Sequence, residues 1–115
     1  MKFYNNLYVS EGLKKKKEKW MKKIEAGKYP LQAYILALCE AGDDQLEFYS
    51  AKMLYQSIVP TENVFIVGLA ESYMDAIYLV EEITKEVFAK TGEADLRSYL
   101  LQQQKLYEEN NKTEV

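Results

Sequence analysis

Two unbroken apolar runs constrain the fold of this chain more than any other feature. They extend from Ala33 to Cys39 and from Val64 to Ala70, seven residues each, which is far short of the roughly 20 residues needed to span a bilayer. A run without alternating polar residues is typical of a strand buried on both faces, as in a parallel sheet. We therefore expect two central strands, although periodicity leaves a helical continuation open for Ala33 to Cys39.

The residues before the first run predict a strand and then a helix. Phe3 to Val9 contains β-branched and aromatic residues around two asparagines. We therefore expect a short, partly solvent-exposed strand at the edge of the sheet. Ser10 is a candidate N-cap, and the apolar spacing after it predicts a helix that ends at Gly27. Seven lysines between Lys14 and Lys23 occupy the outside of this helix.

Three more helices are predicted after the first apolar run. Asp43 or Asp44 is expected to cap a helix between the two runs, because a glutamate stands in the capping-box position after it. Ser72 begins a second capping box, and the helix behind it is expected to end at Gly92. The apolar spacing from Leu96 to Leu106 predicts a final helix.

Strands that alternate with helices predict an α/β fold. The expected architecture is βαβαβα, a small three-stranded parallel sheet with helices and a further C-terminal helix, in which Ala33 to Cys39 and Val64 to Leu69 are adjacent parallel strands. Residues 1–106 are expected to form a single domain, and residues 107–115 a polar tail that frays. Three strands and four short helices leave apolar sheet surface uncovered, so we also expect a homodimer.

The residue types that are missing exclude much chemistry. Cys39 is the only cysteine and histidine is absent, which excludes an internal disulfide, a multi-cysteine zinc site and the histidine-based nucleophile pairs. Cys39 stands at the end of an apolar run, as is typical of a structural thiol. No catalytic residue and no cofactor follow from the sequence, which leaves enzymatic activity undecided and favours a non-enzymatic protein.

Four acidic residues are candidates for a metal site. Glu40, Asp43, Asp44 and Glu71 follow the expected strands, and the carboxyl ends of parallel strands meet at one edge, where ligands bind. A hard cation such as magnesium prefers carboxylate oxygens of this kind. The alternative is structural, because each acid lies near the start of an expected helix, where a carboxylate stabilises the free amides. We favour the structural role.

Charge is distributed unevenly along the chain. Residues 1–30 contain nine lysines and three glutamates, a net charge of +6, whereas the remaining residues contain six basic and fifteen acidic side chains, a net charge of −9. The lysine-rich helix is a candidate surface for nucleic acid or an anionic membrane. The acidic remainder and the single arginine, Arg97, argue against both. We expect a solvated lysine face and no membrane partner, with a nucleic-acid accessory role as the weaker alternative.

Two segments show a further pattern: Leu7 to Leu13 with the lysines that follow, and Val64 to Ala70 with Ser72 and Tyr73. They resemble a family of small uncharacterised proteins from Gram-positive anaerobic bacteria. The resemblance covers Met1 to Leu100. It implies a bacterial protein but no activity, so no functional residue is carried over from it.

The sequence therefore favours a protein-interaction or regulatory module that acts as a homodimer. Ten tyrosines are numerous for 115 residues, and half-buried tyrosines are common at protein interfaces, although they also surround small cores. The alternative from another class is a metal- or small-ligand-dependent enzyme or regulatory domain that uses the acidic loops. The first ten residues lack the apolar segment of a secretory signal, so we expect a cytoplasmic protein.

Overall fold

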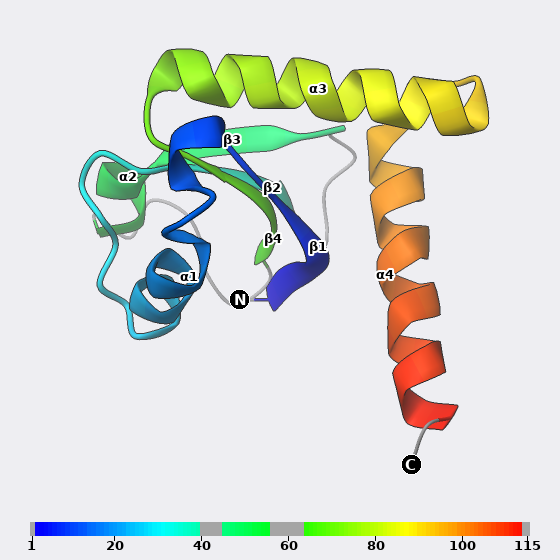
Figure 1. Ribbon diagram of the computed structural model, residues 1–115, viewed down its shortest axis with the longest axis horizontal. Coiled ribbons are helices and arrows are strands. Elements are labelled where there is room, and N and C mark those ends of the chain that lie inside the picture. Colours follow the sequence, from blue (N-terminus) through cyan, green and yellow to red (C-terminus); the bar gives the residue numbers. More distant parts are fainter. Residues whose placement is uncertain (1, 40–44, 56–63, 114–115) are drawn as a thin grey trace.

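The computed structural model describes residues 2–39, 45–55 and 64–113, which form a four-stranded mixed sheet with helices on both faces (Figure 1). The strands are β1 Lys2–Val9, β2 Tyr34–Cys39, β3 Glu47–Ser50 and β4 Val64–Ala70. The helices are the short 3-10 helix η1 Glu11–Leu13, α1 Lys17–Glu25, α2 Ala51–Tyr55, α3 Tyr73–Thr91 and α4 Leu96–Thr113. A mixed α/β fold is thereby confirmed, but the sheet has four strands instead of the three predicted.

The strand order is β1-β4-β2-β3, so the two apolar runs are neighbours in the centre of the sheet and the first strand lies at an edge, as predicted. β1 pairs with β4 in parallel, whereas β2 is antiparallel to both β4 and β3. The prediction that the two apolar runs are parallel is wrong, because Tyr34 pairs with Ala70 and Cys39 with Val64. An unbroken apolar run indicates burial of both faces, and an antiparallel strand that is covered on both sides meets that condition equally well.

The segment after β2 is the second departure from the predicted fold. The sequence predicts a helix from Asp43 or Asp44 onwards, but residues 47–50 form strand β3, and α2 covers only residues 51–55. Phe48 and Tyr49 are residue types that favour strands, and β3 pairs with β2 over its whole length. Pairing with an available strand therefore outweighs a helix signal that depends on capping residues alone.

The remaining helices follow their sequence signals more closely. α3 begins after Ser72, whose Oγ accepts a hydrogen bond of 3.1 Å from the backbone N–H of Asp75, and it ends at Gly92, which has a φ of 77°. α1 is shorter than predicted, because η1 and a turn occupy the residues after Ser10. α4 extends to Thr113, whereas the sequence predicts fraying from residue 107. None of the described helices is both long and apolar enough to cross a membrane.

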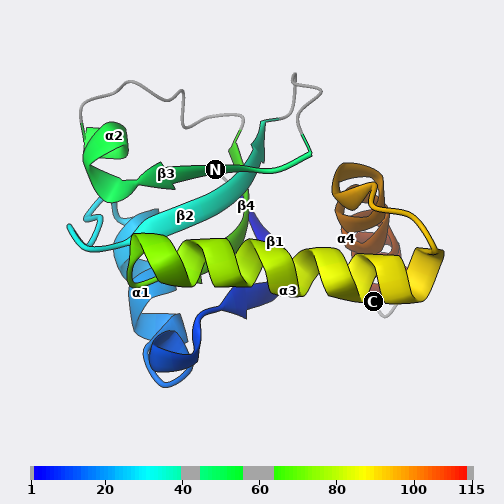
Figure 2. The same cartoon turned by 90° about the horizontal axis from the view of Figure 1, so that it is seen from above.

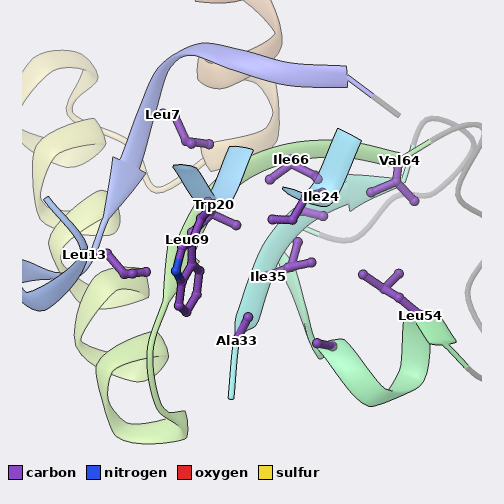
Figure 3. Close-up of a cluster of buried hydrophobic side chains, with 12 residues drawn as sticks. Leu7, Leu13, Trp20, Ile24, Ala33, Ile35, Leu54, Val64, Ile66 and Leu69 are labelled. Atoms are coloured by element: carbon purple, nitrogen blue, oxygen red, sulfur yellow. The ribbon is translucent and has the colours of Figure 1, made fainter. Parts of the chain in front are cut away.

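Buried apolar side chains form two clusters, one on each face of the sheet. The first cluster packs η1, α1 and α2 against the sheet (Figure 3), and the second packs α3 and α4 against the opposite face (Figure 2). The first comprises Leu7, Leu13, Trp20, Ile24, Ala33, Ile35, Ala37, Ala51, Leu54, Val64, Ile66 and Leu69. The second comprises Tyr4, Leu36, Leu38, Phe65, Val67, Ala70, Ala76, Leu79, Ile83, Val87, Leu96 and Leu100. Neighbouring residues of β2 and β4 thus point to opposite clusters, which explains why both strands are apolar throughout.

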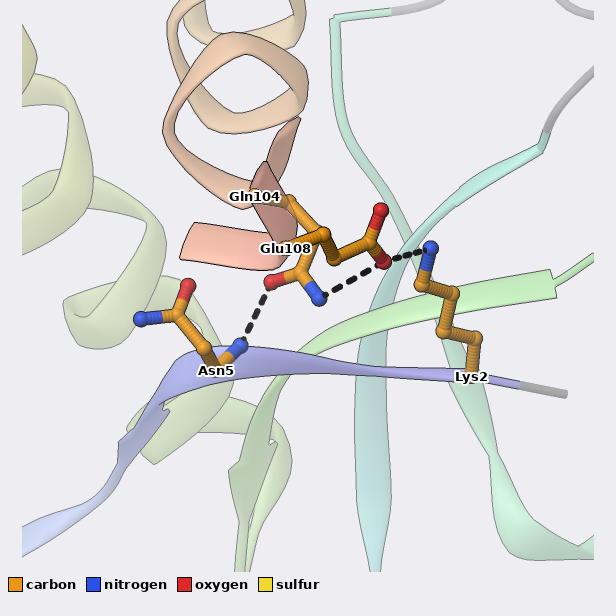
Figure 4. A network of polar contacts seen from close by, with 4 residues as sticks. All are labelled: Lys2, Asn5, Gln104 and Glu108. Atoms are coloured by element: carbon orange, nitrogen blue, oxygen red, sulfur yellow. Dashed lines mark hydrogen bonds and ion pairs between the residues drawn. The ribbon is translucent and has the colours of Figure 1, made fainter. Parts of the chain in front are cut away.

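A polar network holds α4 against the edge strand β1 (Figure 4). Gln104 is only 7% exposed, and its Oε1 accepts a hydrogen bond of 2.7 Å from the backbone N–H of Asn5. Gln104 Nε2 donates to Glu108 at 3.3 Å, and Glu108 forms an ion pair with Lys2. Gln104 therefore satisfies a backbone donor at one edge of the sheet, where unpaired donors would otherwise be available to another strand.

Candidate functional site

The parallel pair β1 and β4 brings two loops together at its carboxyl end. The backbone N–H of Ser10 donates to the carbonyl oxygen of Leu69 at 3.0 Å, so the loop after β1 begins alongside the end of β4. Glu71 is half-buried there, and a Cβ atom at Gly12 would collide with its Oε1. Glu71 is thus the one predicted acidic candidate that the structure places at this edge.

The other three acidic candidates, Glu40, Asp43 and Asp44, lie outside the described residues. Their expected meeting with Glu71 depends on a β2 that runs parallel to β4. β2 is antiparallel, and its last residue pairs with Val64 at the opposite end of β4 from Glu71. Within residues 2–39, 45–55 and 64–113, no three acidic, cysteine or histidine side chains are placed to hold a metal ion.

A cavity of about 200 Å³ lies between the end of β1 and the first turns of α3. Its lining consists of Val9, Ser10, Glu11, Lys14, Asp75, Tyr78, Leu79 and Glu82. Lys14 Nζ forms an ion pair of 2.9 Å with Glu11 Oε2. The hydrogen bond to Glu11 and the charge of that carboxylate raise the pKa of Lys14, and the charge of Glu82 adds to the effect. The cavity is therefore acidic, with one lysine among three carboxylates.

Ser10 does not play the role that its sequence context predicts. An N-cap hydroxyl accepts a hydrogen bond from the first turn of a helix, but the Ser10 side chain makes no such bond at η1. The residue is 7% exposed, and its Oγ is buried without a hydrogen-bond partner. Since buried polar atoms are almost always hydrogen-bonded, this orphaned hydroxyl in a residue of the cavity wall is an unusual feature. The sequence signal, a serine before a glutamate, cannot distinguish it from an ordinary cap.

An aromatic surface lies where the start of α3 meets the edge strand β3. The rings of Tyr34, Phe48 and Tyr73 contact one another pairwise, with centroids 5.6 to 6.5 Å apart. Phe48 is 36% and Tyr73 53% exposed, and Met74 and Ile77 extend the surface along α3 with 51% and 36% exposure. We call these five residues the α3–β3 surface. None of them carries a charge, and sequence reasoning missed Phe48 because it placed that residue in a helix.

The lysine face of α1 points away from the core. Trp20 and Ile24 are 4% and 1% exposed, so the apolar side of α1 is occupied by the sheet and is not available to a membrane. In the part of the chain that the structure describes, the only ion pair of the seven lysines between Lys14 and Lys23 joins Lys14 to Glu11. The face is thus open to solvent, and its use by nucleic acid stays a prediction.

Two tyrosines of β1 are partly or fully buried beneath α3 and α4. Tyr4 stacks on Tyr8 with centroids 5.9 Å apart and meets the edge of Phe65 at 6.0 Å. The hydroxyl of Tyr8 donates a hydrogen bond to the carboxylate of Glu86 on α3. Burial raises the pKa of Tyr4 to about 12. The pKa of Tyr8 is also raised, mainly by burial and then by the hydrogen bond to Glu86. Both hydroxyls stay protonated at neutral pH and belong to the packing of the second cluster.

No protein-family model matches this chain, and no curated protein or solved structure matches it either. The resemblance to small proteins of Gram-positive anaerobes therefore stays a prediction.

Proposed function

We propose that this protein is a non-enzymatic interaction module that acts as a homodimer through the α3–β3 surface. The observation that carries the proposal is the ring cluster of Tyr34, Phe48 and Tyr73, which adjoins the second core cluster and exposes Phe48 and Tyr73 to solvent. Single apolar side chains are ordinary on a protein surface, but a contiguous group that spans two elements is typical of a contact site.

The α3–β3 surface suits a second copy of the same chain. In a two-fold dimer the same patch of each subunit meets itself, so a charged group near its centre faces a like charge. The five residues of the surface are all uncharged, which removes this penalty. Aromatic and methionine side chains are also enriched at the centres of protein interfaces.

The edge strand β3 offers a second contact for the same dimer. In the described sheet β3 pairs with β2 alone and ends the strand order. An edge strand can pair with another chain through its backbone, and lysine or proline commonly prevents this. Glu47–Ser50 contains neither of them. A two-fold arrangement with β3 beside β3 extends the sheet across the dimer and brings the two aromatic clusters close together.

Sedimentation at micromolar concentration tests the proposal. We expect the wild-type protein to have twice the chain mass of 13.4 kDa. Tyr73→Lys is expected to weaken the dimer at least about tenfold, because it places a charge in the aromatic centre of the contact. Tyr73 is 53% exposed, so the fold is expected to tolerate the substitution.

Leu106→Lys is the matched control, because Leu106 is 45% exposed on α4 and lies outside the α3–β3 surface. We expect this variant to dimerise like the wild type. A wild-type mass of 13.4 kDa that does not change when the sample is concentrated would overturn the proposal. The proposal would also be overturned if Tyr73→Lys and Leu106→Lys weakened the dimer equally, because an added charge would then act wherever it is placed.

A further inference from the structure

The lysine face of α1 is a strongly charged surface that the proposed dimer does not use. Six of its seven lysines are exposed and Lys17 is half-buried. Among the described residues, Lys14 alone of the seven forms an ion pair, with Glu11. None of the seven belongs to the α3–β3 surface, so a contact here is independent of the dimer. The seven are Lys14, Lys15, Lys16, Lys17, Lys19, Lys22 and Lys23.

Three of these lysines form a row along one side of α1. Lys16, Lys19 and Lys23 follow one another at intervals of three and four residues, which places the Cβ atoms of neighbours about 5 to 6 Å apart. The two glutamates of α1, Glu18 and Glu25, are roughly 100° or more around the helix from this row. Neither glutamate forms an ion pair with another described residue. The row is therefore not interrupted by acidic side chains.

The stability of α1 does not explain most of these lysines. Lys14 to Lys17 stand at the start of the helix, where the positive end of the helix dipole disfavours cations. Lys16 is the N-cap residue, and its side chain makes no cap hydrogen bond. Lys19 and Lys23 are like charges four residues apart, which destabilise a helix, although Lys22 and Lys23 suit the dipole in the last turn. An anionic partner along the row would neutralise this repulsion.

The side chains around the lysines argue against two kinds of anionic partner. A helix that lies on a membrane inserts its apolar side into the lipid, but Trp20 and Ile24 point toward the sheet and are buried there (Figure 3). Protein interfaces are enriched in aromatic residues and arginine and depleted in lysine. Residues 14–23 contain no arginine, and their one aromatic residue is the buried Trp20. The phosphate groups of a nucleic acid suit this composition better, because lysine binds phosphate as a point charge.

The same composition favours a double helix that is held by its backbone alone. Residues 14–28 contain no arginine, asparagine or glutamine that could read base edges, and they expose no aromatic ring on which unpaired bases could stack. From Lys16 to Lys23 the helix rises by about 10.5 Å, a length over which one DNA strand has about three phosphates. We propose that the lysine face binds the phosphate backbone of double-stranded DNA without sequence preference. The net charge of −9 on residues 31–115 confines the contact to this face.

Fluorescence anisotropy of a labelled DNA duplex of about 20 base pairs tests this inference with the full chain. We expect a dissociation constant in the micromolar range at about 50 mM salt, and about sixfold weaker binding when the salt is doubled, because three neutralised phosphates release their counterions. The triple variant Lys16→Gln, Lys19→Gln, Lys23→Gln is expected to bind at least about tenfold more weakly. Arginine at the same three positions keeps the charge, so that variant is expected to bind at least as tightly as the wild type.

The triple variant Lys52→Gln, Lys85→Gln, Lys105→Gln is the matched control, because it removes the same charge from exposed positions on α2, α3 and α4. We expect it to bind like the wild type, and both glutamine variants to keep the wild-type melting temperature within a few degrees. The inference fails if the control binds as weakly as the row variant or if salt does not weaken binding. It also fails if polyglutamate or vesicles of phosphatidylglycerol displace the duplex at equal charge concentration. A monomeric wild type would overturn the dimer and leave this inference standing, because the row lies within one chain.

Discussion

The two faces of the sheet are covered in opposite ways. The face under α1 and α2 is closed by helices of nine and five residues, whereas the other face carries α3 and α4 with 19 and 18 residues. The side with the longer helices nevertheless exposes more apolar side chains to solvent, so we call it the open face and the other the closed face. Of the ten exposed large hydrophobic side chains among the described residues, nine belong to β3, α3 or α4.

This contrast shows that helix length does not decide whether a face is closed. The outside of α1 is lysine-rich, Trp20 and Ile24 are buried, and Met21 packs against the first cluster, so α1 exposes no large apolar side chain to a partner. The first turns of α3 have apolar side chains both on the core side and on the outside, with Ala76 buried and Tyr73 and Met74 exposed. The second face is therefore the one on which apolar contacts with another molecule are expected.

The largest loss of stability is expected from Trp20→Ala, which alters the closed face. Trp20 is 4% exposed in the first cluster, and removal of a buried aromatic ring typically destabilises a protein by about 3 to 5 kcal/mol. We expect a loss of this size in the free energy of unfolding, measured with urea. Lys19→Ala, at the exposed neighbouring position, is expected to change it by no more than about 0.5 kcal/mol. A small effect of Trp20→Ala would mean that α1 is not what closes this face.

Gln104→Ala, on the open face, is expected to destabilise the protein less than Trp20→Ala does. The substitution removes the acceptor of the Asn5 backbone N–H, in a partly buried hydrogen bond, and a hydrogen bond of this kind contributes about 0.5 to 1.5 kcal/mol. Amide hydrogen exchange is expected to show faster exchange at Asn5 together with the lower stability. Gln102→Ala, an exposed position on the same helix, serves as the control. Unchanged protection of Asn5 would show that α4 is held to β1 by its apolar contacts alone.

The smallest effect is expected on the pH dependence of stability, through a buried tyrosine of the second cluster. Burial raises the pKa of Tyr4 to about 12, above the ordinary tyrosine value of about 10. The folded protein thus holds this proton more tightly than the unfolded chain, and the resulting stabilisation is full below pH 10 and is lost as the pH rises through about 12. We expect urea unfolding to show a shallower loss of stability between pH 10 and 12 in Tyr4→Phe than in the wild type. Tyr107→Phe, which alters an exposed ring of α4, is expected to follow the wild type, and identical slopes for all three proteins would contradict the prediction.

The candidate site was predictable only in part from the sequence. Glu71 does lie at the carboxyl end of the parallel pair β1 and β4, because a strand end next to a helix start is a local feature. Ser10 has the sequence context of a cap, yet its hydroxyl makes no cap bond. Asp75 and Glu82 are ordinary helix residues in the sequence, and only the position of α3 beside β1 makes them neighbours of Ser10 in one cavity.

The sequence by itself determined which segments are buried and where α3 begins and ends. The apolar runs of β2 and β4 and the signals at Ser72 and Gly92 all depend on residues within a few positions of one another, so they can be recognised without the fold. The direction of β2, the strand β3, the cavity and the α3–β3 surface were decided only by the tertiary structure. Each of these depends on pairing between segments that are distant in the chain, and an apolar run has the same composition whether its neighbour is parallel or antiparallel.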